Sequence, residues 1–241
     1  MPAILAIETS TAACSVALRH ISDTGEVRDW WLQSDQPRTH SAILLQLIEQ
    51  LLEQAQLART QLSAVAISTG PGSFTGLRIG LAVAQGLAVG LALPLLPIDS
   101  LEVLASTAQQ QRSLPAGETL VAVTDARMQQ FNFGHFTLAQ AQQRPIRDAP
   151  LQLCGGDQVV EQCCAAQTLA GEISSLQCGD LHPVNCFEIL PRADAMLATA
   201  QQLFTAGGWP AASKVELIYL RGSEAWQKHQ PIMSPSSSSQ T

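Results

Sequence analysis

The chain has 241 residues, 46% of them hydrophobic, and its formal net charge at pH 7 is −7. This length and composition suit one large or two medium globular domains with a substantial core. The basic residues are scattered singly along the sequence, so tight binding of nucleic acid by the chain alone is not expected. The six cysteines form no C-x-x-C pair and the first residues contain no basic leader, which favours the reducing cytoplasm.

The N-terminal part predicts an α/β unit. The alternation of apolar residues and the turn signals predict three short strands in a meander, then an amphipathic helix, a buried strand and a second helix. In chain order these are 3–8, 14–18, 27–32, 34–56, 64–67 and 77–91. Ser34 or Asp35 is expected to cap the first helix, with Pro37 in its first turn.

No charged residue lies between Arg78 and Asp99, and this run approaches the length of a membrane span. Glycines, prolines and Gln85 interrupt it, and no second hydrophobic run accompanies it. We therefore expect a buried helix and no contact with a membrane.

The order of predicted strands and helices begins again after Pro97. Strands are expected at 120–123 and 131–138, helices at 158–170 and 193–206, and a short strand at 176–179 between the two helices. The expected domains are residues 1–102, a smaller unit at 103–234 whose end packs back on the first, and a serine-rich disordered tail at 235–241. The fold class is α/β with mixed sheets flanked by helices.

Glycines and hydroxyl residues fill the run from Ser68 to Gly80, where a buried strand leads into a helix. A helix N-terminus exposes unpaired N–H groups that suit a phosphate, whereas glycines equally permit tight packing of the helix. No lysine follows the turn, so the run is not a Walker A loop. Both interpretations stay open, and a nucleotide would be held by the residues Glu8, Thr9, Gly70, Gly72 and Ser73.

Side chains with catalytic potential are few. Glu8 ends the first strand, where it can orient a metal-bound water or accept hydrogen bonds from the following turn. His40 has Ile43 and Leu44 where a second metal ligand would stand on its helix, so no metal site is expected. No Ser occupies a nucleophile elbow, and Asp125 with Arg127 is expected to form a structural ion pair.

The second helix carries Gly76, Gly80 and Ala84 at every fourth position. This spacing makes a flat seam on one side of the helix. The seam either receives the backbone of a partner helix or packs inside the chain. The two helices together carry more apolar surface than one sheet face covers, which favours a partner.

Six sequence motifs occur in order along almost the whole chain: 4–10, 38–41, 70–80, 84–88, 125–128 and 219–221. With these motifs the chain resembles the bacterial TsaB family, also called YeaZ. The ending from Tyr219 to Lys228 is similar to the gammaproteobacterial branch of that family. Two positions depart from the family pattern, since Glu8 replaces a more usual Asp and Gln130 begins a segment that often reads Glu-Val-Tyr.

The resemblance implies two tandem actin-like, ribonuclease H-like domains. It implies a non-catalytic subunit that works with the catalytic relative TsaD and the ATPase TsaE to place a threonylcarbamoyl group on adenosine 37 of tRNAs reading codons that begin with A. TsaD binds its metal through a His-x3-His motif, and here Leu44 stands where the second His would be. ATP and a metal are thus expected in the partner subunits and no cofactor in this chain.

The resemblance also places the two helices at the interface with TsaD, or with a second copy of the chain when TsaD is absent. tRNA would be contacted only through the complex. The implied partner-binding residues are His40, Leu44, Leu47, Leu51, Phe74, Gly76, Leu77, Gly80, Leu81 and Ala84. Two alternatives remain: an ATPase that uses the Gly70–Gly76 loop, and, more remotely, a glycoprotease-like peptidase.

Overall fold

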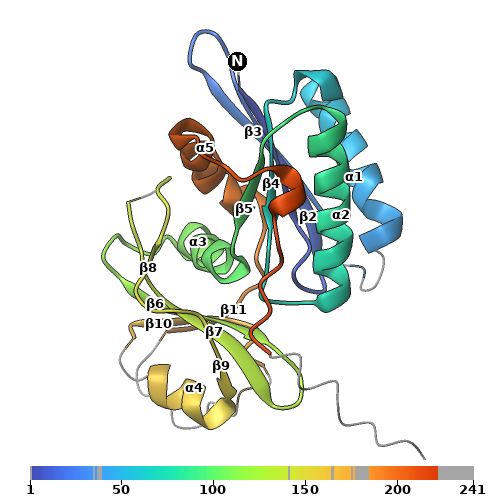
Figure 1. Cartoon of the computed structure of the whole chain (residues 1–241). Coiled ribbons are helices and arrows are strands. Elements are labelled where there is room, and N and C mark those ends of the chain that lie inside the picture. The colour runs from blue at the N-terminus through green and yellow to red at the C-terminus, as the bar shows by residue number, and fades with distance from the viewer. Residues whose placement is uncertain are drawn as a thin grey trace, which may run out of the picture.

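The computed structural model of the chain describes residues 2–34, 36, 40–140, 142–163, 166–174, 176 and 185–221. Two β-sheets follow one another along the chain, and helices pack against them (Figure 1). One helix between the two sheets, α3 (Ser100–Arg112), connects them.

The first sheet has five strands in the order β3-β2-β1-β4-β5. They are Ala3–Glu8 (β1), Cys14–Ile21 (β2), Val27–Ser34 (β3), Ala64–Ser68 (β4) and Leu95–Ile98 (β5). The first three form an antiparallel meander, and β1, β4 and β5 run parallel. Every residue of β1 and β4 is buried, because helices cover both faces of the sheet.

Helices α1 (His40–Ala55) and α2 (Phe74–Gly90) pack side by side on one face of this sheet. Their inward residues share a core with Leu5, Ile7 and Ile67. The opposite face is covered by α3, by α5 (Leu197–Ala206) and by the short 3-10 helix η2 (Ala193–Met196). Two further 3-10 turns are η1 (Arg59–Gln61) and η3 (Ala212–Lys214).

The second sheet has six strands, with the path β11-β10-β6-β7-β8 and β9 paired beside β7. They are Thr119–Asp125 (β6), Gln130–Thr137 (β7), Ile146–Arg147 (β8), Gln152–Gly155 (β9), Thr168–Gly171 (β10) and Asn185–Glu188 (β11). Helix α4 (Gly156–Cys163) packs on one face, and α3 on the other.

The two sheets repeat one topology. Strand β1 pairs antiparallel with β2 and parallel with β4, and β6 pairs in the same way with β7 and β10. The strands that correspond to β1, β2, β3, β4 and β5 are therefore β6, β7, β8, β10 and β11. The expected restart of the pattern is confirmed, as is the fold class of two mixed sheets flanked by helices. The division at residue 102 stays a prediction, and that position lies inside α3.

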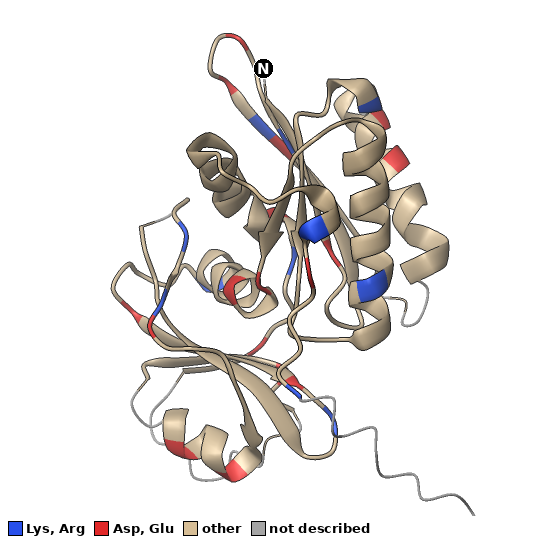
Figure 2. Ribbon diagram, viewed as in Figure 1, with Lys and Arg blue, Asp and Glu red and all other residues tan. Residues whose placement is uncertain are grey.

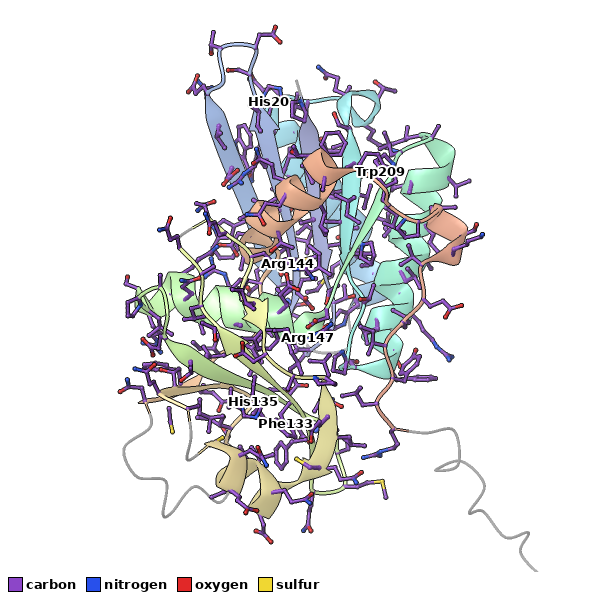
Figure 3. The ribbon with its side chains drawn as sticks, turned by 60° about the vertical axis from the view of Figure 1, so that its left-hand side comes forward. His20, Phe133, His135, Arg144, Arg147 and Trp209 are labelled. Atoms are coloured by element: carbon purple, nitrogen blue, oxygen red, sulfur yellow. The ribbon has the colours of Figure 1, made fainter. Side chains whose placement is uncertain are left out.

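Two ion pairs tie the second sheet to the start of α3. Asp99 caps α3 by accepting the Glu102 amide at 2.7 Å, and both carboxylates are buried. Arg144 forms a bidentate pair with Glu102 at 2.8 Å, and Arg147 of β8 reaches Asp99 at 3.1 Å. Figure 3 shows both arginines directed from the second sheet toward α3. Burial raises the pKa of Asp99 and of Glu102 despite these partners.

Several predicted elements need correction. The helix expected at 158–170 ends at Cys163, and Thr168–Gly171 is instead strand β10, because pairing with β6 on one side and β11 on the other buries it completely. Ser34 ends β3 and does not cap α1, and Asp35 and Pro37 lie outside the described residues. No strand includes Leu176, and the rest of the strand expected at 176–179, like the serine-rich tail, is not described.

Within the described part of the chain, no helix is long and apolar enough to span a bilayer. The uncharged run after Arg78 forms most of α2, the tight turn after it and β5. Figure 2 shows how few charges α1 and α2 carry compared with the rest of the ribbon.

Candidate functional site

A cleft of about 770 Å³ opens between the two sheets, where β1 and β6 end. The turn after β1, the starts of α1 and α2, and the end of β6 form its walls, which brings both halves of the molecule into one site. Its lining residues are Ser10, Thr11, Ala12, His40, Ser41, Gly72, Ser73, Phe74, Thr75, Gly76, Ile79, Asp125, Ala126, Arg127 and Glu172.

Buried polar side chains form the floor of this cleft. The Glu8 carboxylate accepts the Ser10 amide at 2.5 Å, and the Ser73 amide donates to the Ser10 carbonyl at 2.6 Å. Oε2 of Glu8 and the hydroxyls of Thr9, Ser10 and Thr11 are buried without a hydrogen-bond partner among the described residues. Burial raises the pKa of Glu8 against the opposing effect of the hydrogen bond from the Ser10 amide. Glu8 therefore lies beneath the cleft, and its burial disfavours the charge a cation would need.

The glycines of the loop are explained by close packing. A side chain at Gly70, whose φ is +99°, would meet the Ile218 carbonyl at 2.8 Å, and one at Gly72 would meet the Ser10 carbonyl. The loop is thereby held between the β1 turn and the C-terminal segment. Of the five residues proposed for a nucleotide, Gly72 and Ser73 line the cleft, Glu8 and Thr9 lie below it, and Gly70 packs elsewhere.

The seam of Gly76, Gly80 and Ala84 faces inward. A β-carbon on Gly76 would meet the Thr9 carbonyl, and one on Gly80 would meet the Thr9 hydroxyl and Ile67 at 3.2 Å. The prediction that this seam receives a partner is therefore wrong, because the turn after β1 and strand β4 of the same chain already occupy it. The same correction applies to the other buried members of the predicted partner set: His40, Leu44, Leu51 and Leu77.

A second row of small residues on α2 faces outward. Ala82, Gly86 and Gly90 are exposed, and apart from the backbone of α2 itself no described atom lies within 4 Å of a β-carbon built on Gly86 or Gly90. Val89 beside them is 67% exposed, and Leu45 on the neighbouring α1 is 53% exposed. We call these five residues the outer helical face. From the predicted partner set, only Phe74 is exposed, while Leu47 and Leu81 are half-buried.

The β6–β7 turn forms the other rim of the cleft. Asp125 accepts the Arg127 amide at 2.7 Å and its guanidinium at 3.2 Å, which confirms the expected local ion pair. Glu172 and Arg221, the latter from the motif at 219–221, complete this rim. Glu172 accepts the Asp125 amide at 3.1 Å, and Arg221 donates to Gln130 at 2.6 Å. Both come from segments far from this turn in the sequence, so no local pattern predicts that they lie beside it.

The chemistry that this site can perform is limited. His40 lies within 3.2 Å of the Ala13 carbonyl, so one ring nitrogen has a structural partner. The described residues contain no group of three or more His, Cys, Asp or Glu able to hold a metal ion. The arrangement offers hydroxyl groups and a helix N-terminus, which suit binding more than bond cleavage.

Comparison with known proteins gives consistent relatives. The family model described as TsaD, tRNA N6-adenosine threonylcarbamoyltransferase, matches residues 34–152. The tRNA threonylcarbamoyladenosine biosynthesis protein TsaB of Haemophilus influenzae is 33% identical over 93% of this chain and 96% of its own length. TsaB of Escherichia coli is 32% identical over 93% of this chain and 97% of its own length.

Solved structures agree with these relatives. YeaZ from Pseudomonas aeruginosa has a TM-score of 0.80 and 31% identity, covering 91% of this chain and all of its own. A second structure from that organism, described as similar to the peptidase YeaZ, has the same score and identity over 92% of this chain. Each of these structures covers more than nine-tenths of this chain, so the shared fold extends over both sheets.

Proposed function

Because this chain belongs to the TsaB family of tRNA threonylcarbamoyladenosine biosynthesis proteins, we propose that it is the non-catalytic subunit that binds and activates TsaD. With TsaE, the pair would modify adenosine 37 of tRNAs that read codons beginning with A. The chain would act in the cytoplasm, need no cofactor of its own and form a homodimer when TsaD is absent.

The outer helical face is the observation that carries this proposal. Helix α2 has 17 residues and a single charged one, Arg78, near its first turn. Its outward row of Ala82, Gly86 and Gly90 lets another helix backbone approach closely, and Val89 and Leu45 supply exposed apolar area. A surface of this kind, flat and almost free of charge, is suited to a helix pair of similar shape.

A non-catalytic role is consistent with the cleft. Glu8 is buried with a raised pKa, and Leu44 packs in the core where TsaD would carry a metal-binding His. Reaction chemistry would then belong to TsaD and TsaE, and tRNA would be modified in the complex. The property to measure is therefore association with TsaD, and not turnover by the isolated chain.

The test replaces Val89 or Gly86 with glutamate. Each change places a charge on the outer helical face, where Val89 is 67% exposed and a β-carbon on Gly86 would point into open space among the described residues, so folding should be unaffected. We expect co-purification with TsaD to be lost and reconstituted tRNA modification to fall to the level seen without this chain. Val27→Glu, at a valine 49% exposed on β3, is the matched control and should retain both. Full modification by TsaD and TsaE without this chain would refute the activator role.

A second candidate function is nucleotide binding in the cleft. The observation that favours it is a set of buried hydroxyls, at Thr9, Ser10 and Thr11, which have no hydrogen-bond partner in the part of the chain that the structure describes and lie beside the N-terminus of α2. Calorimetry with ATP and magnesium on the purified chain tests it. Tight binding that Ser10→Ala weakens would support this role, and no heat of binding would exclude it.

A further inference from the structure

The C-terminal segment, residues 212–221, is anchored in the first half of the molecule. Val215 is buried in the core that α1 and α2 share with the first sheet, and the Gln85 side chain on α2 donates to the Ala212 carbonyl at 3.0 Å. Further along, the Ile218 amide donates to the Thr69 carbonyl at 2.8 Å. From there the segment passes the start of α2 and reaches the β6–β7 turn of the second half (Figure 1). It therefore bridges the two halves next to the cleft.

Arg221, at the end of this segment, holds the β6–β7 turn. Its Nη2 donates to the carbonyls of Ala126 and Arg127, both at 3.1 Å, and to the Gln130 side-chain oxygen at 2.6 Å. Its Nη1 lies 3.2 Å from the Met128 sulfur. A planar guanidinium presents several donors at fixed angles, so one side chain binds this whole set of neutral acceptors at once.

The backbone of the turn needs such support. Arg127, Met128 and Gln129 have φ angles of 66°, 57° and 59°, in the left-handed region that residues with a β-carbon disfavour. Packing does little to hold this conformation, because Met128 is 80% exposed and the Arg127 side chain is 84% exposed. A conformation of this kind persists where surrounding contacts determine it, and the hydrogen bonds of Arg221 to two carbonyls supply such a constraint.

The same turn forms one rim of the cleft. Asp125, Ala126 and Arg127 line the cleft from the second half, and residues 72–76, at the start of α2, line it from the first half. The position of the turn therefore sets how far apart the two rims lie. Because Arg221 joins the turn to a segment anchored beside α2, the rim of the second half is tied to the first half.

We propose that Arg221 is a positioning residue for the cleft. By binding the β6–β7 turn it fixes the second rim at one distance from the N-terminus of α2, so that a group entering the cleft meets both rims already in place. If Arg221 served only the stability of the fold, its loss would lower the melting temperature without moving the rim. The inference concerns the geometry of the cleft and does not depend on binding to TsaD.

The experiment measures the position of the rim in the full chain. Ketone-bearing amino acids replace Thr60 in the first half and Gln129 in the turn, both exposed, and carry spin labels whose separation is measured by pulsed electron resonance with excess unlabelled chain. Arg221→Met keeps the length of the side chain without its donors and should broaden the distribution of distances. Arg221→Lys keeps the charge without the planar fork and should broaden it as well. Arg127→Met, at an exposed arginine of the same turn, is the control and should leave the distribution narrow.

Amide hydrogen exchange followed by NMR identifies the contacts that are lost. The amides of Ala126 and Gln130 are bonded within the turn and should exchange roughly 10- to 100-fold faster in Arg221→Met, whereas the Ile218 amide, bonded in the first half, should keep its protection. A broadened distribution of distances with these exchange rates supports the proposal. A distribution as narrow as that of the unmodified chain overturns it, even if the melting temperature falls. Equal broadening in Arg127→Met also overturns it, because the turn would then depend on its own ion pair.

Discussion

The two halves of the molecule share a strand order but differ in how much structure surrounds it. In the first half the meander strands β1 to β3 have six to eight residues, and α1 and α2 have 16 and 17. In the second half β6 and β7 have seven and eight residues, but β8 has two against eight in its counterpart β3, and α4 has eight. A short helix buries little apolar area, so the second half depends more on α3 and on its ties to the first half.

The same difference appears at the ends of the first strands. Glu8 ends β1 and Asp125 ends β6, which makes them equivalent positions in the repeated topology. Glu8 is 1% exposed beneath α2, whereas the Asp125 side chain is 23% exposed and pairs with Arg127 at 3.2 Å. Glu8 is therefore part of the core of the first half, whereas Asp125 is part of the rim of the cleft, because a long helix covers only Glu8.

Helix α2 allows a buried and an exposed surface to be compared within one element. Its row of Gly76, Gly80 and Ala84 faces the sheet, and its row of Ala82, Gly86 and Gly90 faces solvent. Gly80→Ala and Gly86→Ala make the same chemical change on the same helix, and both gain helix propensity of about 1 kcal/mol. Gly86→Ala should therefore stabilise the chain slightly. Gly80→Ala should destabilise it by about 1–3 kcal/mol, because the new methyl group meets Thr9 and Ile67. Urea unfolding of both variants measures the difference, and equal midpoints would show that the inner row is not packed.

Much of the first half could be predicted from its sequence. The strands at Ala3–Glu8 and Ala64–Ser68 and the helix at His40–Ala55 have periodic apolar patterns that local physics decides. The second half was harder, because Thr168–Gly171 continues a helical pattern and becomes a strand only through its neighbours in the sheet. Helix α3 was missed although Asp99 followed by Glu102 is a recognisable helix start.

The residues of the candidate site also differ in how far the sequence predicts them. Ser73, Gly72 and Asp125 could be found from the sequence because strands end beside them. Which face of α2 is free could not, since Gly80 and Gly86 look alike until β1 is placed against one of them. Arg221 and Gln130 are 91 residues apart and come together only through the path of the C-terminal segment, so no sequence window contains their contact.

Arg144 tests how far the smaller half depends on the larger one. Arg144→Met removes the bidentate partner of Glu102, whose side chain is 2% exposed, and leaves a buried carboxylate with Thr199 as its remaining side-chain donor. We expect a loss of about 1–3 kcal/mol, below the full cost of breaking a buried pair because Arg144 is itself 46% exposed.

Arg59→Met provides the matched control for this prediction. Arg59 and Glu49 form a pair at 3.1 Å in which both side chains are more than half exposed, and its loss should cost at most about 0.5 kcal/mol. Thermal unfolding of the two variants compares them directly. If Arg144→Met cost no more than Arg59→Met, the ion pairs at the start of α3 would not hold the halves together.

The ionisation of Glu8 makes the stability of the folded chain depend on pH. Burial raises its pKa in the folded chain above 4.5, so the folded state keeps a proton that the unfolded state releases. The contribution of Glu8 to stability is therefore largest below pH 4.5 and falls as pH rises to the folded pKa, by at most about 1.4 kcal/mol per pH unit. Glu8→Gln keeps an acceptor for the Ser10 amide and cannot ionise, so it should remove this part of the slope of stability against pH and raise the melting temperature at pH 7.

Glu53→Gln is the control, because it removes one carboxylate from the exposed side of α1 and should retain the slope of stability against pH of the unmodified chain. An unchanged slope in Glu8→Gln would mean that Glu8 ionises as freely beneath α2 as it does in the unfolded chain.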